Sequence, residues 1–173
     1  MTSSTTERML RVDQAGEFGA TRIYEGQLAV MGSRAPYSRD IAGMAAQEEA
    51  HLATFDAMMA ARGVRPTLLQ PLWSRAGYLL GTLTALIGPE AAMACTVAVE
   101  EEIDRHYSRQ IDALERSGAD PELEGHVRSF REDERAHRDK ALEAGAERSL
   151  ALPLLSGSIR LGCRLAIRLS ERI

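Results

Sequence analysis

Two stretches of the sequence carry the same pairing of a carboxylate with an imidazole. Glu48 stands three positions before His51, and Glu134 stands three positions before His137. On a helix, residues three positions apart lie on one face and can reach the same ion. One such pair is common in helical proteins, whereas two in a chain of this size point to a metal site with mixed oxygen and nitrogen ligands.

A further glutamate precedes each pair. Glu17 lies 31 residues before Glu48, and Glu100 lies 34 residues before Glu134. All six residues fall on apolar stripes at helical spacing, which favours a position facing the core over one on a solvated helix surface. Four buried carboxylates would repel one another unless they were protonated or bound to cations. The pattern therefore predicts positive charge, supplied by metal ions, in the centre of the protein.

Glu100 has two acidic neighbours, so the helical period must choose among them. Glu101 shares a face with polar positions and is predicted to point to solvent. Glu102 takes an intermediate position on the flank of the helix. We therefore predict that Glu100 is the ligand of the three.

The chain also contains an internal repeat. Residues at the same offsets follow the first glutamate of each half, namely Glu17, Arg22, Tyr24 and Gln27 in one half and Glu100, Arg105, Tyr107 and Gln110 in the other. Two helix pairs of one design imply a bundle with pseudo-two-fold symmetry. Its composite site would lie at the axis.

Glycines and prolines divide the sequence into helices. Four long helices are predicted at 7–31, 39–62, 90–117 and 121–146, with two further helical segments at 71–88 and 154–171. No stretch shows the alternating period of a strand. We expect an all-α protein, with residues 1–173 forming one domain built on a four-helix bundle. The six candidate ligands match the set found in di-iron and di-manganese carboxylate bundles.

Composition excludes several other classes of protein. The chain has 173 residues, 25 of them acidic and 21 basic, with a net charge of −4, which gives no reason to expect a nucleic-acid-binding protein. The two cysteines, Cys95 and Cys163, form no CxxC pair. A disulfide scaffold and a cysteine-based zinc site are therefore excluded.

The segments 71–88 and 154–171 are predicted to lie at a membrane interface. The first places Trp73 and Tyr78 among leucines, as in amphipathic helices at the bilayer surface. The second carries arginines at four-residue steps that could face anionic head groups. Neither is predicted to span a bilayer, since a spanning helix needs roughly 20 apolar residues. The alternative is that both segments pack on the bundle or in a dimer interface.

Long stretches of the sequence resemble one family of enzymes. RVDQAGEFGATRIYEGQLAV, QEEAHL, RPTLLQPLW, EAAMACTVAVEEEIDRHY, FREDERAH and CRLAIRLSERI are similar to segments of the demethoxyubiquinone hydroxylases of ubiquinone biosynthesis. The resemblance runs from about Arg11 to Ile173 and includes the two segments 71–88 and 154–171. It is therefore more specific than a match to the metal motifs alone.

The resemblance implies a ferritin-like di-iron bundle that hydroxylates the ring of a demethoxyubiquinone or demethoxyubiquinol, using O₂ and reducing equivalents from NADH. The family's iron ligands fall on Glu17, Glu48, His51, Glu100, Glu134 and His137. In the family, Glu48 and Glu134 would bridge two iron ions. Iron and manganese both suit such ligands, so the residues alone leave the metal open.

The resemblance also places a His-Tyr pair of the family on His106 and Tyr107. The functional interpretation is a relay for electrons or protons, or a contact with the substrate. The alternative is a core tyrosine beside a partly exposed histidine. Tyr24, the repeat partner of Tyr107, fits a core position equally well.

The resemblance further implies where the protein works and with what. A polyprenyl quinone substrate lies in the bilayer, so the protein would bind the membrane surface peripherally. The sequence begins without the mitochondrial leader of eukaryotic members, which favours the cytoplasmic face of a bacterial inner membrane. The interpretation leaves room for a homo-oligomer or for a partner protein of the quinone pathway.

Two other functions are compatible with part of the pattern. A bundle of this kind could store iron or remove peroxide, because fold does not fix function. A non-enzymatic helical adaptor at the membrane is the other alternative. No GxGxxG motif is present, so a Rossmann-type nucleotide site is not expected. Electrons would then reach the metal through the bound quinone or from a separate reductase.

Overall fold

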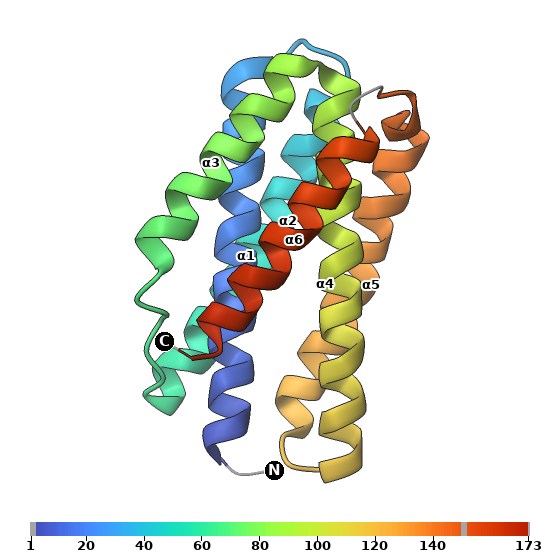
Figure 1. The fold of residues 1–173 in the computed structure, drawn as a ribbon. Coiled ribbons are helices and arrows are strands. Elements are labelled where there is room, and N and C mark those ends of the chain that lie inside the picture. The colour runs from blue at the N-terminus through green and yellow to red at the C-terminus, as the bar shows by residue number, and fades with distance from the viewer. Residues whose placement is uncertain (1–2, 150–151, 173) are drawn as a thin grey trace.

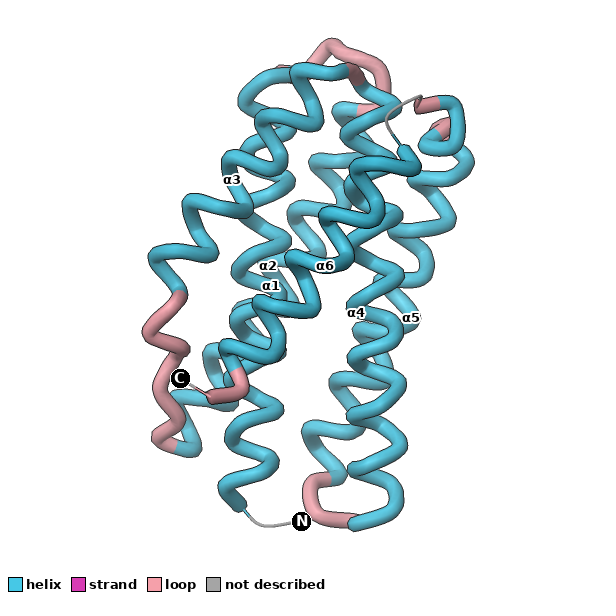
Figure 2. The backbone as a smooth tube through the Cα atoms, viewed as in Figure 1, coloured by secondary structure: helices cyan, strands magenta, loops and turns pink. Residues whose placement is uncertain are grey.

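The computed structural model describes residues 3–149 and 152–172, and this part of the chain is almost entirely helical (Figures 1 and 2). The predicted all-α class is confirmed, and the described residues contain no strand. The elements are α1 (Ser3–Met31), α2 (Ser38–Arg62), α3 (Gln70–Ile87), α4 (Pro89–Ser117), α5 (Pro121–Glu143), the short 3₁₀ helix η1 (Ala146–Arg148) and α6 (Leu152–Ser170).

The predicted helix bounds are correct to within a few residues, with two differences. The first helix starts at Ser3 rather than at residue 7. The fourth long helix was expected to reach residue 146 but ends at Glu143. Gly145 adopts a left-handed conformation with φ of 89°, which ends the α-helix and starts η1.

Four helices form the bundle that positions the centre of the protein. α1 and α2 pack as one antiparallel pair, and α4 and α5 pack as the second. α3 and α6 lie outside the four, on the side formed by α1 and α4, where α3 packs mainly on α1 and α6 mainly on α4 (Figure 1). This is the predicted four-helix bundle with two additional helices.

Glycines bring α3 into backbone contact with α1. A Cβ atom at Gly81 would clash with the carbonyl oxygen of Ile23, and one at Gly26 would clash with that of Tyr78. A side chain at either position would therefore push the two helices apart. The close packing of α1 and α3 thus requires glycine at positions 26 and 81.

The helix ends are fixed by local chemistry. The carboxylate of Asp120 accepts a hydrogen bond of 3.1 Å from the backbone N–H of Leu123, which caps α5. Gly32 and Gly118 take left-handed conformations directly after α1 and α4. The loops inside the two helix pairs are consequently short, and each pair presents a fixed set of faces to the other.

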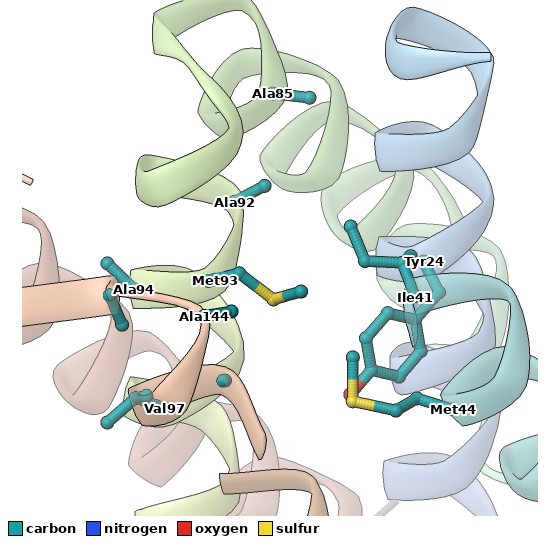
Figure 3. Packing of buried hydrophobic residues seen from close by; sticks show 11 residues of the cluster. Tyr24, Ile41, Met44, Ala85, Ala92, Met93, Ala94, Val97 and Ala144 are labelled. Carbon is teal, nitrogen blue, oxygen red and sulfur yellow. The ribbon is translucent and has the colours of Figure 1, made fainter. Parts of the chain in front are cut away.

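The apolar core is divided by a polar layer. One cluster contains Tyr24, Ile41, Met44 and Met93. In Figure 3 the first three side chains lie together, and Met93 points toward them from α4. A second cluster, which includes Leu10, Phe55, Tyr107, Leu114 and Phe130, occupies the other end of the bundle. The predicted ligands on α2 and α5 fall between the two clusters in the sequence of each helix.

α6 is tied to the bundle by polar contacts. Arg160 pairs with Glu101 at 2.5 Å, and Trp73 Nε1 of α3 donates a hydrogen bond of 3.0 Å to Ser170 Oγ. The prediction that Glu101 points to solvent was therefore wrong, because α6 covers this face of α4 and leaves Glu101 half-buried. Among the described residues, no helix is both long and apolar enough to cross a bilayer.

Candidate metal centre

The bundle brings all six predicted ligands together in its interior. α1 supplies Glu17, α4 supplies Glu100, and α2 and α5 each supply one glutamate and one histidine. None of the six is more than 4% exposed, so the expectation that they face the core is confirmed. Lys and Arg side chains are absent from the buried residues of the described chain. The protein itself thus places no permanent cation among these carboxylates.

The six residues form two overlapping groups that could each hold a metal ion. The first group is Glu17, Glu48, His51 and Glu134, and the second is Glu48, Glu100, Glu134 and His137. Within each group, one ligand atom from every residue lies within 4.8 Å of the others. Glu48 and Glu134 belong to both groups, which is the arrangement that two bridging carboxylates require.

Both histidines turn Nδ1 toward the carboxylates. Nδ1 of His51 lies 3.6 Å from Glu17 Oε2 and 3.4 Å from Glu134 Oε1. Nδ1 of His137 lies 3.0 Å from Glu48 Oε1 and 3.3 Å from Glu134 Oε2. The inward ring nitrogen of each histidine is thus surrounded by carboxylate oxygens.

These inward atoms are not satisfied by hydrogen bonds. Nδ1 of both histidines, both side-chain oxygens of Glu48 and of Glu134, and one oxygen each of Glu17 and Glu100 are buried without a partner of acceptable geometry. Buried unpaired polar atoms are costly, and such a concentration calls for an occupant. Carboxylate oxygens with imidazole nitrogens and no thiolate fit iron or manganese. The residues present therefore fit a pair of such ions.

The carboxyl groups show how unfavourable their charges are without metal. Burial, followed by the charge of Glu134, raises the pKa of Glu48 and of Glu100 well above the ordinary value. Burial also raises the pKa of Glu134 to about 7, although contact with His51 opposes this rise. For Glu17 burial acts in the same direction, but contacts with its neighbours, led by His51, lower its pKa overall.

A tyrosine from each half of the repeat reaches the glutamate of the other half. Tyr107 donates a hydrogen bond to Glu17 Oε1, and Tyr24 donates one of 2.8 Å to Glu100 Oε1. Burial and the nearby carboxylates raise the pKa of both phenols, so they remain donors. The sequence alone does not decide between a core position and a site position for Tyr24. The matching offsets in the repeat were the signal that could have placed it beside Glu100.

His106 lies next to Tyr107 and is buried. The alternative interpretation, in which His106 is partly exposed, was therefore wrong. His106 Nε2 lies 3.1 Å from Oδ1 of the buried Asp13. It also lines a cavity of about 390 Å³ between α1, α4 and α6, whose other walls carry the cationic side chains of Arg8, Arg109, Arg164 and Arg168. His106 thus lies between this basic cavity and the polar layer.

The outer nitrogens of the two histidines have partners that sequence reasoning missed. His51 Nε2 lies 3.2 Å from Asp133 Oδ2, and His137 Nε2 lies 3.0 Å from Gln47 Oε1. Asp133 and Gln47 each stand directly before the glutamate of a Glu-x-x-His pair. That position was the available signal, because it lies one residue from the ligand face of the helix.

A helical bundle with two shared carboxylates and two Glu-x-x-His pairs is the arrangement found in di-metal carboxylate proteins. Residues 4–170 match the family described as ubiquinone biosynthesis protein COQ7, and the chain belongs to this family. The resemblance on which the sequence interpretation rested is thereby confirmed.

Individual relatives cover nearly the whole chain. A 3-demethoxyubiquinol 3-hydroxylase of Rhodospirillum rubrum is 53% identical over 169 residues, which are 96% of this chain and 78% of the relative. The human NADPH-dependent 3-demethoxyubiquinone 3-hydroxylase, mitochondrial, is 46% identical over 172 residues, 98% of this chain and 79% of the relative. The 5-demethoxyubiquinone hydroxylase, mitochondrial, of Saccharomyces cerevisiae is 39% identical over 181 residues, 96% of this chain and 78% of the relative.

The raised pKa of Glu134 predicts how the stability of the metal-free protein depends on pH. Its carboxyl group keeps a proton in the folded state up to about pH 7, whereas the unfolded chain releases it near the ordinary value of 4.5. The folded state therefore binds more protons between these values, and its free energy of unfolding falls as pH rises through the window, by about 3 kcal/mol for this group. Urea unfolding of metal-free protein between pH 4.5 and 7.5 measures the fall.

Glu134→Gln is the matched variant, since the amide cannot ionise and keeps the size of the side chain. Its stability should depend less on pH across the same window. His51, whose pKa is raised to about 10 by Glu134 and Glu17 against the lowering effect of burial, adds a slope of the same sign above pH 6.5. Equal pH slopes in the parent and in Glu134→Gln would contradict the assignment.

Proposed function

We propose that this chain is an oxygen-dependent hydroxylase that acts on the ring of a demethoxyubiquinol in ubiquinone biosynthesis and holds two iron ions. The single observation that carries the proposal is the pair of overlapping ligand groups joined by Glu48 and Glu134. Membership of the COQ7 family and the printed names of the relatives support the substrate. The proposed unit is the whole chain, residues 1–173, acting as one domain.

Each of the six residues has a defined role in this proposal. Glu17 and His51 would hold one ion, Glu100 and His137 the other, and Glu48 and Glu134 would join the two. The iron pair would supply the activation of O₂, which protein side chains cannot perform. The two apolar clusters keep bulk water away from the carboxylates, and the tyrosines Tyr24 and Tyr107 orient the terminal glutamates.

His106 and Tyr107 are proposed as the path by which electrons and protons reach the centre. Tyr107 touches Glu17, and His106 connects Asp13 to the Arg-lined cavity. We propose that the reductant is a nicotinamide coenzyme. The family resemblance implies NADH, whereas the human relative is named NADPH-dependent. A direct comparison of the two coenzymes decides between them.

Two alternative functions are less well supported. Iron storage or peroxide removal would use a similar ligand set, but the family match and the names of the relatives favour a hydroxylase. A non-enzymatic membrane adaptor would not explain six buried ligands with unsatisfied inward atoms. A homo-oligomer or a partner of the quinone pathway stays a prediction.

We further propose that α3 and α6 hold the protein on the membrane surface, as a polyprenyl quinone substrate requires. Both helices cover the α1 and α4 side of the bundle. Eight of their large apolar side chains are at least 41% exposed, namely Leu72, Leu79, Leu83, Leu86 and Ile87 of α3 and Leu161, Leu165 and Leu169 of α6. Arg164 and Arg168 of α6 are exposed beside these leucines and would meet anionic head groups. The proposed location is peripheral, at the cytoplasmic face of a bacterial inner membrane.

Iron binding and hydroxylation test the proposal together. We expect the metal-free protein to take up about two Fe(II) per chain without oxygen, and to gain near-ultraviolet absorbance when O₂ is admitted. With reductant, mass spectrometry should show one added hydroxyl on a demethoxyubiquinol analogue. Glu134→Ala should lose both properties, because it removes a ligand shared by the two groups.

The control is Glu132→Ala, which changes a glutamate with a 65% exposed side chain on the same helix. It should keep both the iron and the activity. Parallel reactions with NADH and NADPH identify the coenzyme. Wild-type protein that takes up no stoichiometric iron would refute the proposal.

Tyr107→Phe tests the proposed path for electrons. We expect reduction of the ferric protein by the coenzyme, measured by stopped-flow absorbance with quinone present, to slow by about tenfold or more. Iron stoichiometry should stay near two, because the phenol does not belong to either ligand group. Tyr24→Phe is the matched control, since it removes the equivalent bond to Glu100. Similar slowing in both variants would mean that Tyr107 only supports the ligand.

Flotation with anionic vesicles tests the membrane surface. Wild-type protein should float with the lipid, and Leu83→Asp on α3 or Leu165→Asp on α6 should shift most of it to the soluble fraction, because each puts a charge where apolar surface meets lipid. Leu142→Asp, on an exposed leucine of α5, is the control and should float normally. Wild-type protein that stays in the soluble fraction would contradict the proposal.

A further inference from the structure

The two halves of the centre differ where they hold the outer nitrogens of the histidines. Gln47 and Asp133 occupy the same place in the repeat, and each crosses to the histidine of the other half. His137 Nε2 contacts the amide oxygen of Gln47 at 3.0 Å, and His51 Nε2 contacts a carboxylate oxygen of Asp133 at 3.2 Å. The geometry is nearly symmetric, whereas the charge is not.

The charge of the outer partner changes the donor strength of the inner nitrogen. When Nε2–H donates to an acceptor, Nδ1 keeps its lone pair facing the carboxylate cluster. A carboxylate acceptor draws the proton more strongly than an amide and makes the imidazole a better metal ligand. His51 is therefore built as the stronger donor of the two histidines.

A second carboxylate lies on the same side. Asp13 stands four residues before Glu17 and is only 2% exposed, and Thr96 takes the equivalent place before Glu100. The charge of Glu17 contributes to raising the pKa of Asp13, after the larger effect of burial, so the two groups interact. Asp13 also contacts His106, whose Nε2 lies 3.1 Å from Asp13 Oδ1. This contact disperses part of the negative charge of the Asp13 carboxylate. Both additional carboxylates thus flank the ligand group of Glu17 and His51.

We propose that the two metal positions are unequal, and that Asp133 is a positioning residue that makes the group of Glu17, Glu48, His51 and Glu134 the tighter one. Gln47 leaves the group of Glu48, Glu100, Glu134 and His137 as the weaker one. The inference rests on the proposed function, because it requires that the cluster binds two metal ions. It adds that the tighter metal position fills before the weaker one.

Manganese binding tests the inference without catalysis. Metal-free wild-type protein is titrated with Mn(II), and the free ion is followed by its electron paramagnetic resonance signal. We expect two resolved binding steps. Glu17→Gln should weaken the tight step and Glu100→Gln the weak step, which assigns each step to a ligand group.

Two reciprocal variants then isolate the outer partners. Asp133→Asn keeps an acceptor oxygen and removes the charge, so the tight step should weaken by about tenfold. Gln47→Glu supplies the missing charge at His137, so the weak step should tighten by a similar factor. Because the second variant gains affinity, loss of folding cannot imitate its result.

Asp139→Asn is the matched control. It makes the same substitution on the same helix, at a side chain that is 59% exposed and pairs with Arg138. It should leave both steps unchanged. Two equal steps in the wild type, or an Asp133→Asn variant with an unaltered tight step, would overturn the inference and leave the proposed function standing. Absence of any Mn(II) and Fe(II) binding would instead overturn the proposed function itself.

Discussion

The mutual repulsion of four buried carboxylates is the constraint on which the rest of this structure depends. Glu17 and Glu100 each lie within a few ångström of both Glu48 and Glu134, and the buried residues of the described chain include no lysine or arginine. Such a group is costly in an apolar interior, and the raised pKa values of three of its members reflect that cost. The bundle tolerates it because four helices fix the side chains, phenols hold the outer oxygens, and metal ions would neutralise the charge.

The two halves of the chain depend on each other at this centre. Each half contributes a glutamate whose hydrogen-bond donor, a tyrosine, comes from the other half, and each histidine is held from outside by a residue of the other half. Neither helix pair could complete a ligand group alone, since both groups need Glu48 from α2 and Glu134 from α5. The assembly of the bundle and the formation of the site are therefore one event. The helices α3 and α6 stay outside that exchange, which leaves their exposed leucines free for the membrane contact proposed above.

The helices and the six candidate ligands could be predicted from the sequence. The contacts that could not be predicted were missed for physical reasons. Helical spacing placed His51 and His137 in the core, because an apolar stripe has only one buried direction. The same reasoning misplaced Glu101. Helical periodicity describes one helix by itself, and it carries no information on the packing of α6 over Glu101. The partners Asp133, Gln47 and Asp13 were missed because contacts across the bundle depend on the relative rotation of helices far apart in the chain. Their positions beside the repeated motifs were visible, but their contacts were not.

The position of the metal ions tests the central claim most directly. A crystal of the protein loaded anaerobically with Fe(II) can be measured on both sides of the iron absorption edge, so that anomalous scattering locates each ion. We expect two iron peaks inside the bundle, both in contact with Glu48 and Glu134, one beside His51 and the other beside His137. A single peak, or iron bound outside the layer between the two apolar clusters, would contradict it.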